Sequence, residues 1–232
     1  MNLRELRQLA AKNELSLNFI AKDLIISKTL VLLQEVQGIV LKGGTAINRI
    51  YLKQQMRFSE DIDLDLNFDG TPKEALKKTE GIVKKLDIFD KIDKPRIMNS
   101  TIRYDLYFTN PLGQKDKIRL EFKVKKITEK YSKEIVNFGF TPTESALLNV
   151  YDKKVLIKHK IDCLLSRKEG KDIYDLYYLL GEDTKNLKVN LDMEKNEIKK
   201  IANSTNHYIP RKLRPNWPII IEKLKEKFSK IN

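Results

Sequence analysis

The sequence predicts an α/β fold, in which a small mixed sheet with flanking helices is followed by a helical C-terminal part. Apolar and polar residues alternate in segments 62–68, 102–108 and 118–124, as they do in half-buried strands. Beyond about residue 150, apolar residues recur mainly at helical spacing. We therefore expect two domains, residues 1–145 and residues 146–232, with a soft boundary near 140–150. The second domain is expected to contribute to the functional site of the first.

The remaining elements follow from the same patterns. A short apolar strand is expected at 39–41, a last strand at 146–150, and hairpin turn chemistry in the loop NPLGQKD. Pro72 suits the first turn of a helix. The predicted helices cover residues 3–12, 17–36, 46–52, 72–86, 152–166, 171–180, 191–202 and 217–229.

The composition favours a polyanionic partner. The 45 Lys and Arg residues exceed the 32 Asp and Glu residues, which gives a net charge of +13. A lysine-rich proteome or a thermophile surface is the alternative explanation. The single cysteine, Cys163, excludes a disulfide framework. We see neither a signal peptide nor a membrane-spanning stretch, so we expect a cytoplasmic protein.

The stretch DIDLDL places three carboxylates, those of Asp61, Asp63 and Asp65, on one face of a strand. Same-face residues lie about 7 Å apart, so two of them can converge on metal ions held about 4 Å apart, as in two-metal phosphoryl-transfer sites. Oxygen ligands of this kind suit Mg²⁺ or Mn²⁺. A solvated edge strand is the alternative interpretation.

The preceding segment Gly43-Gly44-Thr45 has the features of a phosphate cradle. The glycines would let the backbone approach a ligand closely, and a helix starting at Ala46 would point its free N–H groups at an anion. Thr45 is expected to cap that helix or to bind a phosphate. Arg57 and Ser59 could add phosphate contacts. A plain turn would explain the glycines alone, but the cradle and the acidic strand together favour a nucleoside triphosphate site.

The stretch KGGTAINRIYLKQQMRFSEDIDLDL resembles the nucleotidyltransferase signature of the polymerase-beta-like superfamily. Within it, the chain closely resembles the AbiEii/AbiGii toxin family, which includes the AbiE abortive-infection toxins and the MenT tRNA-modifying toxins. The resemblance covers most of residues 18–180. The departures are Ile47 in place of the usual Leu, the additional acid Asp65, and Lys171 where the family usually has Arg.

Superfamily members usually take a third carboxylate from a neighbouring strand. IRLEFKV offers Glu121 and TIRYDLYF offers Asp105, each on the polar face of its strand. The resemblance favours Glu121. A solvated strand charge is the alternative for either residue.

The segment DKKVLIKHKIDCLLSRKEGKDIYDLYYLL resembles the second block of the family. Lys160 falls on the apolar face of its helix, so it must snorkel, find a partner or serve a site. We expect it to hold the triphosphate and to neutralise the leaving pyrophosphate. Asp172 and Asp175 project to neighbouring positions, and the resemblance assigns a function to one of them. A simple charge at a helix N-terminus is the alternative for Asp172.

The resemblance implies the transfer of an NMP from an NTP, with Mg²⁺ or Mn²⁺, to an acceptor that is plausibly tRNA. Asp61, Asp63 and Glu121 would bind the metal ions. It also implies a toxin of a toxin–antitoxin or phage-defence system, with a separate antitoxin protein encoded nearby. Nucleotidylation of a protein or small molecule is one alternative, and a non-catalytic RNA- or partner-binding module is another. The base that is chosen and the acceptor are not fixed by the sequence.

Overall fold

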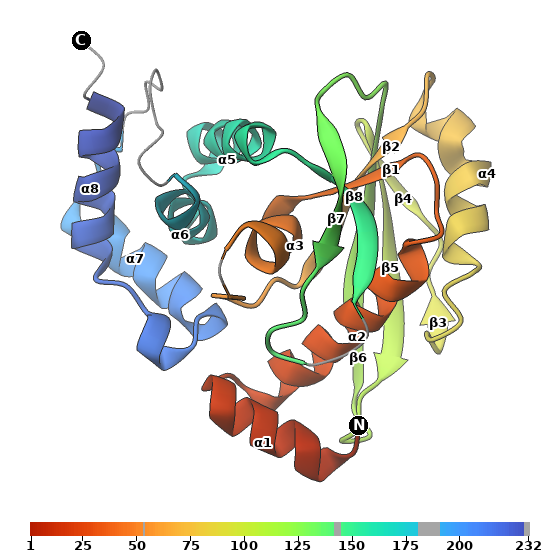
Figure 1. The fold of residues 1–232 in the computed structure, drawn as a ribbon, viewed down its shortest axis with the longest axis horizontal. Coiled ribbons are helices and arrows are strands. Elements are labelled where there is room, and N and C mark those ends of the chain that lie inside the picture. The colour runs from red at the N-terminus through yellow and green to blue at the C-terminus, as the bar shows by residue number, and fades with distance from the viewer. Residues whose placement is uncertain (53, 142–144, 181–190, 230–232) are drawn as a thin grey trace.

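The computed structural model describes residues 1–52, 54–141, 145–180 and 191–229 (Figure 1). Its centre is an eight-stranded mixed sheet with the strand order β3-β5-β6-β2-β1-β8-β7, and β4 also pairs with β5. Strand β2 runs parallel to β6 and β1 runs parallel to β8, whereas the other pairs are antiparallel. The strands are β1 (Ile39–Lys42), β2 (Asp61–Asn67), β3 (Lys91–Ile92), β4 (Arg96–Met98), β5 (Thr101–Thr109), β6 (Lys115–Lys125), β7 (Tyr131–Val136) and β8 (Ala146–Tyr151).

Helices surround this sheet, and those of the C-terminal part gather on one side of it (Figure 1). The predicted fold class, a mixed sheet with flanking helices and a helical C-terminal part, is therefore confirmed. The α-helices are α1 (Leu3–Asn13), α2 (Leu17–Leu33), α3 (Gly43–Ala46), α4 (Pro72–Val83), α5 (Lys153–Arg167), α6 (Gly170–Leu179), α7 (Lys195–Thr205) and α8 (Trp217–Ser229). The shorter turns are the π-helical η1 (Ile47–Tyr51) and the 3-10 turns η2 (Asn206–Tyr208) and η3 (Arg211–Leu213).

The alternation in β2 divides the sheet into an apolar and a polar face. Leu64 is paired with Leu41 of β1 and with Phe122 of β6, and all three side chains are buried. On the polar face, Asp63 is paired with Lys42 of β1 and with Glu121 of β6. Directly paired residues in neighbouring strands point to the same side of a sheet, so the register itself brings these charged residues together.

The start of α3 differs from the expectation. The helix was expected to begin at Ala46, but it begins at Gly43, and its N-cap residue is Lys42. Thr45 therefore lies inside the helix and does not cap it. Its hydroxyl group donates a hydrogen bond of 2.6 Å to the carbonyl of Asp61, and its side chain is fully buried. Glycines form the first helical turn, where an added Cβ atom would meet the side chain of Asp63 or of Arg57.

Strands β3, β4 and β7 were not predicted. The first two are very short, and the residues of β7 are largely exposed, so none of them shows the alternation on which a strand prediction depends. The register places the exposed Ile135 of β7 opposite the exposed Leu147 of β8. The face of β7 that carries Ile135 is therefore exposed.

The C-terminal part is built around its own group of buried apolar residues, distinct from the group that fills the sheet and the N-terminal helices. Strand β8, within residues 146–232, nevertheless pairs with β1 and β7. The division at residue 145 remains a prediction. In the part of the chain that the structure describes, no helix is long and apolar enough to cross a membrane.

Candidate active site

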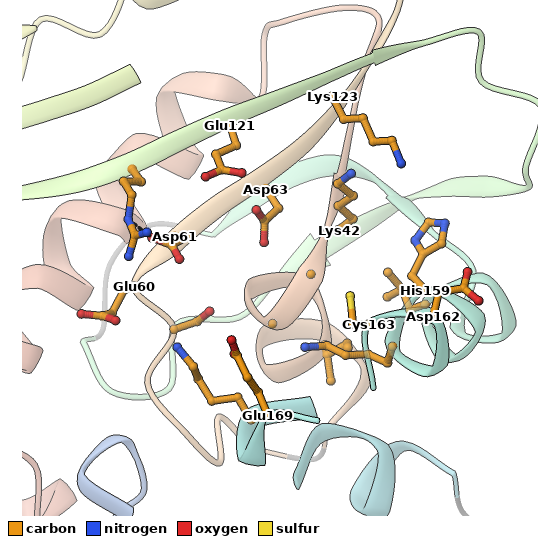
Figure 2. A pocket seen from close by; sticks show the side chains of 18 of the residues that line it. Lys42, Glu60, Asp61, Asp63, Glu121, Lys123, His159, Asp162, Cys163 and Glu169 are labelled. Carbon is orange, nitrogen blue, oxygen red and sulfur yellow. Dashed lines mark ion pairs between the residues drawn. The ribbon is translucent and has the colours of Figure 1, made fainter. Parts of the chain in front are cut away.

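A cavity of about 670 Å³ lies between the polar face of the sheet and helices α5 and α6 (Figure 2). The segments that line it come from β1 and α3, from residues 57–61, from β2, β5 and β6, and from the two helices. Most of the predicted site residues meet here: Gly43, Gly44, Arg57, Ser59, Asp61, Asp63, Glu121 and Lys160. Thr45, Asp172 and Asp175 are not among the lining residues.

The carboxylates form part of a charged row that crosses four strands. Lys42 of β1 is opposite Asp63 of β2, Asp63 is opposite Glu121 of β6, and Glu121 is opposite Arg103 of β5. Neighbouring strands lie about 4.8 Å apart, so two acidic side chains adjoin each other in the middle of the row. Asp105, the alternative candidate for the third carboxylate, does not line the cavity. It forms ion pairs with Arg96 at 2.6 Å and with Lys117 at 3.0 Å.

Burial and like charge act together on the central acids. Burial raises the pKa of Asp63, and the negative charge of Glu121 raises it further. Burial also raises the pKa of Asp61, to about 6, although Arg119 opposes the shift. A group of hard oxygen donors whose negative charges lie this close together fits a divalent cation chemically.

The donors do not converge, however. Among the described residues, no group of three or more His, Cys, Asp or Glu side chains is arranged to hold a metal ion. Arg103 binds Glu121, with 2.7 Å between Nε and Oε1. Arg119 lies with its Nε 2.8 Å from Oδ1 of Asp61. Two of the three acids therefore face arginines.

Lys160 is the centre of a buried ionic network behind the cavity. Its ammonium group lies 2.7 Å from Asp172 and 2.8 Å from Asp175. Burial alone would lower the pKa of Lys160, but the two carboxylates outweigh it and the pKa is raised. Arg57 and Lys160 likewise overcome the burial of Asp175 and hold its pKa at about 2. All these groups are therefore charged at neutral pH.

Both aspartates also anchor an arginine. Asp175 receives Nε and Nη2 of Arg57 at 2.7 and 2.6 Å, whereas Asp172 receives Nε of Arg167 at 2.9 Å. Asp172 and Asp175 are fully buried. Each thus holds basic residues that line the cavity, and Asp172 is more than a helix-terminal surface charge.

The two glycines are needed for close packing with site residues. Gly43 has a φ of +69°, and a Cβ atom there would overlap the carboxylate of Asp63. A Cβ atom at Gly44 would overlap the guanidinium of Arg57 and would lie 2.9 Å from Oγ of Ser59. The glycines therefore let the charged side chains of the site lie close to the backbone, and the expected approach of a ligand to them stays a prediction.

Asp65, the third acid of the strand, belongs to a different set of contacts. It is 1% exposed, accepts a hydrogen bond of 2.6 Å from the hydroxyl of Tyr151, and forms ion pairs with Lys42 and Lys125.

Figure 2 shows Lys123 and His159 on the opposite side of Asp63 from Asp61 and Glu60. Burial lowers the pKa of His159.

Several residues of the cavity were not identified from the sequence. Arg103, Arg119 and Lys123 line it together with Lys42 and Lys125. Their positions on the polar faces of β5 and β6 were visible in the alternation, but the register that places Arg103 beside Glu121 was not. Asn48 was missed as well, although its amide donates hydrogen bonds of 3.1 Å to Gly44 and to Asp175.

Three solved structures share this fold along nearly the whole chain. JHP933 from Helicobacter pylori has a TM-score of 0.57 and 16% identity, covering 93% of this chain and 95% of its own. A putative nucleotidyltransferase from the same organism has a TM-score of 0.53 and 17% identity, covering 93% and 98%. MenT4, a nucleotidyltransferase toxin from Mycobacterium tuberculosis, has a TM-score of 0.60 and 14% identity, covering 99% and 89%. At these identities the likeness establishes the fold alone.

The sequence comparisons give the family. No curated protein matches this chain. The family model described as "Nucleotidyl transferase AbiEii toxin, Type IV TA system" matches residues 25–229, which include every residue of the cavity and of the network behind it. The chain therefore belongs to the AbiEii family of nucleotidyltransferase toxins of type IV toxin–antitoxin systems.

Proposed function

We propose that this toxin transfers an NMP from an NTP to a hydroxyl group of an RNA acceptor, in a reaction that depends on Mg²⁺ or Mn²⁺. One observation carries the proposal: Asp61, Asp63 and Glu121 line the same cavity as the Gly43–Gly44 turn and Lys160. A site for two-metal phosphoryl transfer needs oxygen ligands beside a region that holds the triphosphate.

The reaction breaks a phosphoanhydride bond of the NTP and forms a phosphodiester bond to the acceptor. The acceptor oxygen bonds to the α-phosphorus, the bond from that phosphorus to the bridging oxygen of the β-phosphate breaks, pyrophosphate leaves, and the hydroxyl proton passes to solvent. Asp61, Asp63 and Glu121 would hold the metal ions, which when bound polarise the phosphoryl oxygens. Gly43, Gly44, Arg57 and Ser59, which line the same cavity, would contact the triphosphate.

Lys160 supplies positive charge where pyrophosphate develops. Its pKa is raised, so it is an ammonium ion throughout the neutral range. Asp172 and Asp175 hold it in place and are positioning residues. Removal of preorganised charge of this kind typically reduces kcat by about 10²–10³.

The acceptor is proposed to be RNA, with tRNA the first candidate. The net charge of +13 and the basic residues of the cavity support a polyanion. The separate antitoxin that the family implies would be a second protein chain.

The test is incubation with each labelled NTP, Mg²⁺ and total tRNA, for the wild type, Asp63→Ala and Asp162→Ala. Asp162 lines the same cavity but is exposed and, among the described residues, has no ion-pair partner, so it controls for the loss of one negative charge. We expect labelled RNA with the wild type and Asp162→Ala, and at least a 100-fold loss with Asp63→Ala.

The other outcomes separate the alternatives. RNA labelling that persists in Asp63→Ala would contradict the site. Label on a protein would show that the acceptor is a protein and not RNA. A lack of labelling with all four nucleotides would favour a binding module.

A further inference from the structure

Two arginines on neighbouring strands hold two of the acids proposed to bind metal. Arg103 of β5 is opposite Glu121, and its Nη2 and Nε atoms lie 2.6 and 2.7 Å from Oε1 of that residue. Arg119 of β6 is opposite Asp61, with a distance of 2.8 Å between Nε and Oδ1. The side chains of Arg103 and Arg119 are 23% and 38% exposed, and both line the cavity. Both arginines are therefore partly accessible from the cavity.

The arginines occupy the electrostatic position of a cation. Each arginine contacts a single oxygen of its acid, Oε1 of Glu121 and Oδ1 of Asp61, so a metal ion shared by the two acids would compete with the arginines for these carboxylates. A divalent ion bound to these oxygens would take over the neutralisation of their charge. The two guanidinium groups would then be released, still within the cavity and without their partners.

The position of the arginines indicates which ligand they would meet next. Across the sheet the order is Lys42 at the end of β1, next to Gly43 of α3, then Asp63 on β2, Glu121 on β6 and finally Arg103 on β5. Under the proposed function, the triphosphate lies at the β1 end, near Gly43 and Lys160. Since the attacking and leaving oxygens of phosphoryl transfer are roughly in line, the acceptor must approach from the β6 and β5 end.

We propose that Arg103 and Arg119 bind phosphodiester groups of the acceptor polynucleotide, and that Glu121 and Asp61 hold them back until these acids bind a divalent cation. Guanidinium groups match phosphate oxygens with two parallel hydrogen bonds, which suits them to this exchange. The inference rests on the proposed function for the direction of approach, but it names two residues and a coupling that the function does not require.

The chain offers a matched control in Lys123. It lies on β6 two residues beyond Glu121, lines the same cavity, and is exposed. Among the described residues it has no ion-pair partner. Lys123→Gln removes the same charge as Arg103→Gln or Arg119→Gln, but it frees no carboxylate.

The first measurement is the binding of Mn²⁺ alone, followed by electron paramagnetic resonance. We expect Arg103→Gln and Arg119→Gln to bind Mn²⁺ about fivefold or more tightly than the wild type, because each removes a competing cation from an acid. Lys123→Gln should change the affinity less. Equal effects of all three variants would overturn the proposed competition.

The second measurement is the anisotropy of a labelled single-stranded RNA, with and without Mn²⁺ and without NTP. For the wild type, we expect Mn²⁺ to strengthen RNA binding about fivefold or more. Arg103→Gln and Arg119→Gln should lose most of this gain, and Lys123→Gln should retain it. Arg103→Lys and Arg119→Lys keep the charge but lose the paired hydrogen bonds, so they should also lose most of it. A wild type without the gain, or glutamine variants that keep it, would overturn the inference.

The failure of the inference and that of the proposed function can be distinguished. NMP transfer that depends on Asp63, together with unchanged RNA coupling in the arginine variants, would retain the function and reject the inference. Metal-coupled RNA binding that depends on the arginines, without any NMP transfer, would retain the inference and reject the proposed function.

Discussion

At Lys160, burial and charge act in opposite directions. The side chain is 6% exposed, and burial lowers the pKa of its ammonium group, but Asp172 and Asp175 outweigh this effect and the pKa is raised. The sequence could show that a lysine falls on an apolar helix face. It could not show that both candidate aspartates hold this lysine, because their three-residue spacing only places them on the same side of α6. Each of the two aspartates also holds a different arginine, and the functional role of either one stays a prediction.

Lys160→Met keeps the volume of the side chain and removes its charge. We expect kcat for NMP transfer to fall about 10²–10³-fold. The free energy of unfolding should fall by about 3 kcal/mol, because two buried carboxylates lose a partner. Lys158→Met, at an exposed position on the same helix, should leave both quantities nearly unchanged. Steady-state kinetics and urea denaturation measure them, and a kcat within threefold of the wild type would remove Lys160 from the mechanism.

The turn from β1 through α3 into η1 shows how one element assembles the site. A π-helical turn inserts an extra residue into a helix and is common at functional sites. Here η1 carries Asn48, which hydrogen-bonds Gly44, Asp175 and the backbone N–H of Arg57. The sequence predicted a helix over this range but not its π form, since the pattern of apolar residues does not distinguish the two.

Alanine replacements at two glycines test this element, because they are expected to have opposite effects on stability. Gly43→Ala would place a side chain at a φ of +69° and against Asp63, so we expect a loss of about 1–2 kcal/mol of stability and at least a 100-fold loss of activity. Gly81, inside α4, has no neighbouring atom within 4 Å of an added Cβ, so Gly81→Ala should gain about 0.5–1 kcal/mol. Urea midpoints and kcat report both effects. A Gly43→Ala protein with wild-type activity would contradict the packing argument.

The strands of the sheet were predictable to different degrees for a physical reason. Strands β2, β5 and β6 each bury one face, so apolar and polar residues alternate along their sequences. Strand β7 has mostly exposed residues and was missed. The register is a tertiary property, so the contact of Arg103 with Glu121 could not be predicted even though both residues lie on predicted strands.

For the whole molecule, the charge of +13 should appear as a steep dependence of acceptor binding on salt. If about three phosphates are neutralised, raising KCl from about 50 to about 200 mM should weaken the binding of single-stranded RNA about tenfold or more. Anisotropy titrations at several salt concentrations give the slope. A flat profile would show that the basic surface reflects composition and not polyanion binding.

The strand order also determines when the site can exist during synthesis. Strand β8 lies between β1 and β7, yet it leaves the ribosome after both, and α5 with Lys160 follows it directly. Until about residue 167 has emerged, the nascent chain has β1 with one open edge, β7 without its partner, and three carboxylates without the lysine. Under the proposed function, a translation product truncated before α5 would lack Lys160 and would be inert, and its open strand edges would make it prone to aggregate. We therefore expect the toxin to become active only once most of its chain has been made.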